Sequence, residues 1–93
     1  MAVSTGLALP PHLDIAAAAP LKDRLLALRG RDLELDGSAV VRMGALCLQV
    51  LLAASRSWRK DGHTFRIVDP SHGLCEALRQ MGAAPALPRS QGE

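Results

Sequence analysis

Apolar residues recur along this chain with two different spacings. Alternation at every second residue, which is typical of half-buried strands, occurs in three short segments: residues 4–9, 32–35 and 63–68. A spacing of three or four, which is typical of a helix with one buried face, occurs in three longer segments: residues 20–28, 45–60 and 72–81. The two kinds of segment alternate, so the pattern predicts strands joined by helices, with a βαβ unit over residues 33–71.

Proline, glycine and serine indicate where these elements begin and end. A Pro-Pro pair after Leu9 ends the first strand, and residues 12–15 are expected to pair with it as a short second strand. Pro20 suits the first turn of the first helix, which Gly30 stops. Ser71 is placed to cap the third helix.

The middle helix has the clearest division between buried and exposed positions. Its predicted buried face consists of Leu48, Leu51 and Leu52, with Ala54 or Ser55 beside them. Arg59 and Lys60 lie in its last turn, where cations interact favourably with the helix dipole.

A chain of 93 residues makes one domain, and the order of elements predicts the α/β class. We expect a small, mixed, mostly parallel sheet of four or five strands covered by about three helices. Trp58 and Phe65 are the only aromatic residues, so Leu and Ala must fill the core. The domain is expected over residues 1–83, and the Pro-rich residues 84–93 are expected to form a disordered tail.

Charge and composition argue against several classes of function. Eleven Lys and Arg against nine Asp and Glu leave a formal charge of +2 that is scattered along the chain, which gives nucleic-acid binding no support. The longest apolar run, residues 45–54, is about half of a membrane span, and the N-terminus does not resemble a signal peptide. We therefore expect a cytoplasmic protein without membrane insertion, in which Cys47 and Cys75 are reduced thiols rather than a disulfide.

The candidate catalytic and metal-binding residues have simpler structural explanations. Cys47 would be reactive if a helix N-terminus lowered its pKa, but its apolar pattern favours an inert core residue. The Asp-Pro-Ser-His segment at 69–72 is explained as a turn and a helix cap rather than a hydrolytic triad. His63, His72 and Cys75 have the residue types of a zinc site but lack a second close pair. We expect no catalytic residue, no metal site and no cofactor.

Three blocks of the sequence are similar to a known family. They read LDIAAAAPLKDRLLAL, LELDGSAVVRMGALCLQVLLAASRSWRKDG and FRIVDPSHGLCEALRQMGA. In their order and spacing, from about residue 7 to residue 83, they resemble the STAS domain of bacterial anti-sigma factor antagonists. Arg-Met-Gly before the loop and Cys-Leu-Gln-Val-Leu after it resemble a subgroup of small stand-alone STAS proteins found beside chemotaxis and two-component genes.

In that family a loop reading roughly Asp-Ser-Ser-Gly-Leu opens a helix, and a partner kinase that is also the anti-sigma factor phosphorylates the second serine. The aligned residues here are Gly44, Ala45, Leu46, Cys47 and Leu48. Leu46 stands at the phosphoserine position and has no hydroxyl, so the resemblance implies that this switch is missing. Ser38 is the nearest loop hydroxyl, and whether it is modified stays open.

The resemblance implies a non-enzymatic signalling module that binds a protein, either a histidine-kinase-like or an anti-sigma-type regulator. The expected partner-binding residues lie in the loop and helix start at 42–49: Arg42, Met43, Gly44, Ala45, Leu46 and Gln49. One alternative is an accessory STAS subunit that binds the ATPase of a bacterial phospholipid ABC transporter. Another is an enzyme with a reactive cysteine. The identity of the partner, homo-oligomer formation and the binding of a nucleotide or small ligand stay open.

Overall fold

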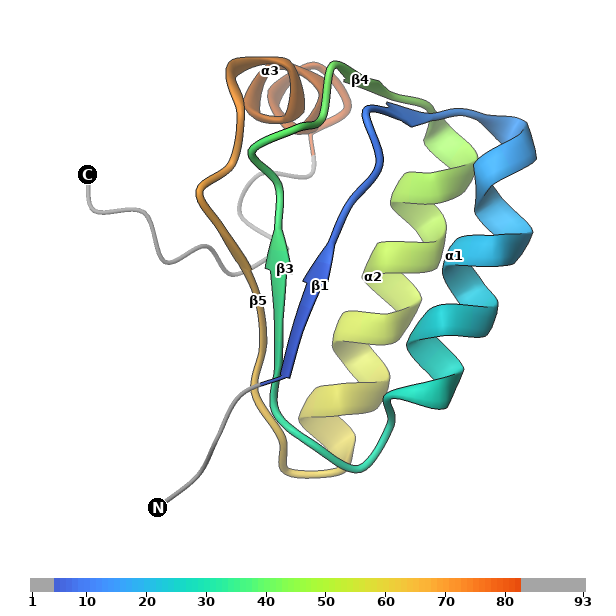
Figure 1. The fold of residues 1–93 in the computed structure, drawn as a ribbon, viewed down its shortest axis with the longest axis vertical. Helices are drawn as coiled ribbons and strands as arrows, with labels where there is room; N and C mark the ends of the chain where they lie inside the picture. Colours follow the sequence, from blue (N-terminus) through green and yellow to red (C-terminus); the bar gives the residue numbers. More distant parts are fainter. Residues whose placement is uncertain (1–4, 83–93) are drawn as a thin grey trace.

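Residues 5–82, which are the residues described in the computed structural model, form strands and helices in the order ββαββαβα (Figure 1). The strands are β1 (Thr5–Ala8), β2 (His12–Leu13), β3 (Leu33–Asp36), β4 (Arg42–Met43) and β5 (Phe65–Val68). The helices are α1 (Ile15–Ala27), α2 (Ala45–Lys60) and α3 (His72–Gln80). The predicted α/β class, with three helices and about five strands, is confirmed. The expected tail at 84–93 lies outside the described residues.

All strand pairs in the described part of the chain are parallel. β1, β3 and β5 form a three-stranded sheet with β3 in the centre, and β2 and β4 form a separate pair. The expectation that residues 12–15 pair with the first strand is wrong, because this segment pairs with β4. Pro10 and Pro11 explain the difference, since two consecutive residues without an N–H do not support a tight hairpin with β1.

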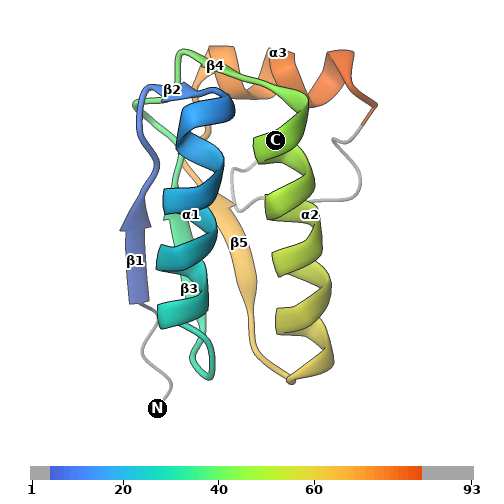
Figure 2. The ribbon, with the colours of Figure 1, turned by 90° about the vertical axis from the view of Figure 1, so that its right-hand side faces the viewer.

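Two of the three helices, α1 and α2, lie on one face of the three-stranded sheet. α1 and α2 run side by side along this face, and α3 lies across the end of the molecule that holds β4 (Figures 1 and 2). Leu35 and Ile67, on neighbouring strands, are completely buried. Alternate positions point the other way, where Arg66 forms an ion pair with Glu34. The period-two pattern therefore separates an apolar, helix-covered face from a more polar one.

α1 begins at Ile15, earlier than the expected start at Pro20. Asp14 is its N-cap, and the Asp14 carboxylate accepts a hydrogen bond from the Ala17 N–H at 3.1 Å. An Asp cap followed by a run of alanines favours helix initiation strongly. Pro20 lies inside the helix and leaves the carbonyl of Ala16 without its usual donor. Because Ala16 is exposed, water can replace that donor.

α2 buries one face along its whole length. The buried residues are Cys47, Leu48, Leu51, Ala54, Ser55 and Trp58. The predicted burial of Leu48 and Leu51 is confirmed, and both Ala54 and Ser55 are buried, but Leu52 is only partly buried. The buried face is centred near Leu51, since it contains positions 47, 51, 54 and 58. Leu52 is turned about 100° away from this direction, which explains its partial exposure.

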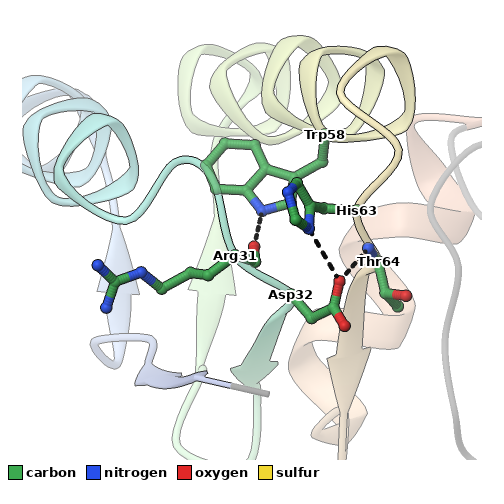
Figure 3. Close-up of polar contacts among 5 residues, drawn as sticks. All are labelled: Arg31, Asp32, Trp58, His63 and Thr64. Carbon is green, nitrogen blue, oxygen red and sulfur yellow. Dashed lines mark hydrogen bonds and ion pairs between the residues drawn. The ribbon is translucent and has the colours of Figure 1, made fainter. Parts of the chain in front are cut away.

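Polar contacts connect two loops at the end of the molecule opposite β4 (Figure 3). The Trp58 Nε1–H donates to the Arg31 carbonyl at 2.8 Å. One Asp32 carboxylate oxygen accepts from the Thr64 N–H at 2.9 Å and lies 3.3 Å from Nδ1 of His63. The Thr64 N–H, with a smaller contribution from the His63 ring, lowers the pKa of Asp32. These contacts join the loop before β3 to the last turn of α2 and to the loop before β5.

α3 has the predicted serine cap and packs closely on β4. Ser71 Oγ accepts from the Leu74 N–H at 3.0 Å and donates to the Val40 carbonyl. A Cβ added to Gly73 would lie only 2.1 Å from the Val41 carbonyl oxygen, so only glycine fits there. This close approach anchors the strand that leads into α2.

Candidate partner-binding surface

Backbone hydrogen bonds hold the entry into α2 in place. The Val41 N–H donates to the Pro11 carbonyl at 2.7 Å, and the Gly44 N–H donates to the Leu13 carbonyl at 2.9 Å. α3 packs against the same strand. Because β2 and α3 both support this entry, the side chains at the start of α2 are presented on a well-anchored backbone.

Five of the six residues predicted to bind a partner are exposed, and we call them the α2-start surface: Arg42, Gly44, Ala45, Leu46 and Gln49. Leu46 is the largest apolar side chain among them and is 46% exposed. Met43, the sixth residue, is only 7% exposed and belongs to the hydrophobic core. Its predicted contact with a partner is therefore not supported. Successive side chains of a strand point to opposite sides. In β4 the Arg42 side chain therefore points outward and the Met43 side chain points inward.

The N-terminus of α2 has no side-chain cap. Gly44 occupies the N-cap position in an extended conformation, with φ −92° and ψ 172°, and the first turn contains no acidic residue. In contrast, Asp14 caps α1 and Ser71 caps α3. The first N–H groups of α2 therefore lack a side-chain acceptor among the described residues, and this end carries the partial positive charge of the helix dipole.

Cys47 lies directly behind this surface and faces the core. Its side chain is fully buried, and its Sγ–H donates to the Asp14 carbonyl at 3.2 Å. Burial, and to a smaller extent the negative charge of Asp14, raises the pKa of the Cys47 thiol. Because the thiolate is the reactive form, Cys47 is held in its unreactive state. This agrees with the core position that its apolar pattern predicted.

The other chemical candidates are engaged in structural contacts or lie apart. The Ser71 hydroxyl bonds to backbone groups on both sides, as its role in capping α3 requires. Cys47 and Cys75 are not joined in a disulfide. In residues 5–82, no three His, Cys, Asp or Glu side chains are grouped so that they can hold a metal ion. Ser38 is exposed, and its N–H bonds to the Asp36 carboxylate at 2.9 Å.

A hollow of about 330 Å³ between α1 and α2 extends from the α2-start surface. Leu46 and Gln49 belong to both, and Lys22 and Leu26 line the hollow from α1. The sequence contained one signal for it: Leu25 and Leu26 are adjacent, so a helix can bury only one of them fully. Leu25 is buried and Leu26 is 52% exposed.

Comparison with known proteins identifies the family that this fold and this surface suggest. Residues 2–88 match the family model described as "Mlab, STAS domain". The chain therefore belongs to the STAS domain family, whose members are generally non-enzymatic regulatory modules that interact with protein partners.

A solved structure has the same fold. The NMR structure of the protein TM1081 superimposes with a TM-score of 0.78 at 18% sequence identity, covering 95% of this chain and 74% of that one. No curated protein matches the chain. Among residues 5–82, no helix has both the length and the apolar character needed to cross a membrane.

Proposed function

We propose that this STAS domain is a non-enzymatic signalling module that binds a regulatory protein through the α2-start surface. The partner is a histidine-kinase-like or anti-sigma-type regulator in the cytoplasm, as in the chemotaxis and two-component systems that the resemblance implies. Binding is not switched by phosphate at the usual serine position, because Leu46 occupies it.

The exposed side chain of Leu46 is the observation that carries this proposal. Ala45 and Gln49 beside it are uncharged, and Arg42 supplies one cation. Burying one leucine side chain under a partner is worth about 1.5–3 kcal/mol. A phosphate here would add a charge of about −1.5 to −2 and oppose that burial. Because Leu46 accepts no phosphate, the surface stays competent to bind.

One observation favours a second function. The matching family is described by the name Mlab, which supports the alternative that this chain is the accessory STAS subunit of a phospholipid ABC transporter and binds its ATPase. Both functions use protein binding and require no catalysis. They differ in the partner, so identification of the partner separates them.

Affinity purification of the tagged full chain from its native cytoplasm tests the proposal. The wild-type chain should enrich a kinase-like or anti-sigma-type regulator, and Leu46→Asp should lose it. Thr64→Asp adds the same charge at an exposed position in the loop before β5, at the opposite end of the molecule, and should retain the partner. Enrichment of a transporter ATPase would favour the second function. Equal recovery with Leu46→Asp would move the interface away from the α2-start surface.

Mass spectrometry of the protein from cells tests the absence of a phosphate switch. Ser38 is the nearest loop hydroxyl, and we expect it to be unmodified. Stoichiometric phosphate on Ser38 would overturn the unswitched mode of binding.

A further inference from the structure

The hollow between α1 and α2, which run side by side in Figure 2, is lined mostly by apolar residues. Leu26 lines it from α1, and Val50 and Ala53 line it from α2 below Leu46. Ile15 lies on the same side of α1 as Leu26, three helical turns earlier. Ile15, Leu26 and Leu46 are 80%, 52% and 46% exposed, and Val41 is the one other large apolar side chain exposed in residues 5–82. Exposed apolar residues are thus concentrated along this hollow.

Cations flank the hollow without compensating acids. Lys22 lines it, and Arg56 and Lys60 continue the exposed row of α2 that contains Gln49 and Ala53. None of these three cations has an ion-pair partner among the described residues. The sequence of α2 contains no acidic residue, and that of α1 contains one. An occupant of the hollow therefore meets apolar walls and positive charge.

We propose that this hollow binds an amphipathic helix of the partner protein, with an apolar stripe flanked by Asp and Glu side chains. The inference rests on the proposed function, because Leu46 and Gln49 belong to both surfaces. α1 has 13 residues and is therefore about 20 Å long, which matches a docked helix of three to four turns. Acidic side chains on that helix would pair with Lys22, Arg56 and Lys60.

The charge argues for a different protein rather than a second copy of this chain. Two copies docked through this face would bring the cations of one hollow against the same cations of the other, which is repulsive. A membrane surface is flat, whereas the apolar residues here lie on both walls of a hollow that a helix ridge can fill.

Charge reversal tests the electrostatic part of the inference. The binding partner in this experiment is the protein identified by the affinity purification. Lys22→Glu and Arg56→Glu should each weaken binding about tenfold at low salt, and the loss should shrink as salt is added. Arg24→Glu is the matched control, because Arg24 lies on the other flank of α1 against β1. It should change the affinity by less than about twofold. Equal losses for Arg24→Glu and Lys22→Glu would overturn the proposal.

Site-specific photocrosslinking tests the position and nature of the occupant in the full chain. A photoreactive residue replaces exposed Ala53 in the hollow, or Arg42 on the α2-start surface. Crosslinks from both positions to the same partner, with the Ala53 crosslink mapping to an acidic amphipathic helix, would support the inference. Crosslinks from position 42 alone would contradict helix binding in the hollow and would leave the proposed function standing. Crosslinks from neither position would contradict both the proposed function and helix binding in the hollow. A crosslink from position 53 to a second copy of the chain or to lipid would contradict a partner helix as the occupant.

Discussion

Two leucines in α2 show how the surroundings of a residue determine its role. Leu51 is completely buried among the core residues, whereas Leu46, five positions earlier in the sequence, is 46% exposed. Both have the same side chain, so the difference comes from their phase on the helix. Leu51 therefore contributes to stability, and Leu46 is the residue that we propose for binding.

Leu51→Ala should lower the free energy of unfolding by about 2–5 kcal/mol, because it removes buried methyl groups and leaves a cavity. That is a large part of the stability of a small domain. Denaturant unfolding is the measurement, and Leu46→Ala is the control, with an expected change within about 0.5 kcal/mol. A Leu51→Ala protein with an unchanged melting temperature would show that the helix phase is wrong.

Arg42→Glu should weaken partner binding by reversing the one cation of the α2-start surface. If Arg42 attracts an acidic partner, the loss of affinity should be larger at low salt than at high salt. Titration of the partner at two ionic strengths measures this difference. A loss that does not depend on salt would indicate that Arg42 acts through shape rather than charge.

Residue burial could be predicted from the sequence only where a long pattern fixes it. The row of apolar positions along α2 was sufficient to place Leu51 inside and Cys47 in an apolar environment. Met43 was not predictable, because a strand of two residues has no pattern that distinguishes its inner side from its outer side. Its burial follows from the pairing of β4 with β2, which lies 30 positions away in the sequence.

At the level of elements, α2 differs from the other two helices because its N-terminus has no side-chain cap. Its extended backbone at Gly44 accepts any residue, and a Cβ there would make an ordinary 3.7 Å contact with the Leu13 carbonyl oxygen. A capping side chain is therefore sterically allowed at residue 44. Because none is present and the first turn has no acidic residue, no side chain there offsets the partial positive charge of the helix N-terminus.

Gly44→Asp should raise the free energy of unfolding by about 0.5–1 kcal/mol, through a cap hydrogen bond and the helix dipole. Gly44→Ala supplies no cap and should lower it by about as much. The same Gly44→Asp variant should bind the partner more weakly, since it places a carboxylate on the proposed binding surface. Thermal unfolding and titration together measure both effects, and a destabilised Gly44→Asp protein would contradict the cap geometry.

The ends of elements were predictable where the signal is local. Ser71 lies three residues before the Leu74 N–H that it caps, so the start of α3 follows from a few adjacent residues. The start of α1 was predicted wrongly because Pro20 was given more weight than Asp14, although proline is tolerated where the carbonyl that loses its donor is exposed. The pairing of β2 with β4 depends on distant residues and has no local signal.

At the scale of the whole molecule, the two ends differ in the residues that they carry. The end with β2, β4 and the start of α2 presents the proposed binding surface, whereas the opposite end holds the cluster of Asp32, Trp58 and His63 (Figure 3). The hollow between α1 and α2 extends from the α2-start surface, and its existence depends on how two helices pack. That arrangement is not encoded in either helix alone, so the sequence did not predict it.

The opposite end should make stability sensitive to acid. The folded-state pKa of Asp32 lies below its ordinary value of 3.8, so its ionised carboxylate stabilises the fold above that pH. This contribution is lost as the pH falls through the folded pKa. Asp32→Asn should therefore lower the melting temperature near neutral pH, and the difference from wild type should shrink below about pH 4. A difference that stays constant down to pH 2 would contradict this assignment.

Calorimetric titration of the captured partner with the wild-type chain and with Leu46→Asp tests the central claim most directly. An aspartate is favourable near a helix N-terminus, so the variant should keep its fold and melting temperature. It should bind about tenfold or more weakly, because the buried leucine contact is lost. A folded Leu46→Asp protein that binds with wild-type affinity would contradict the assignment of the α2-start surface as the interface.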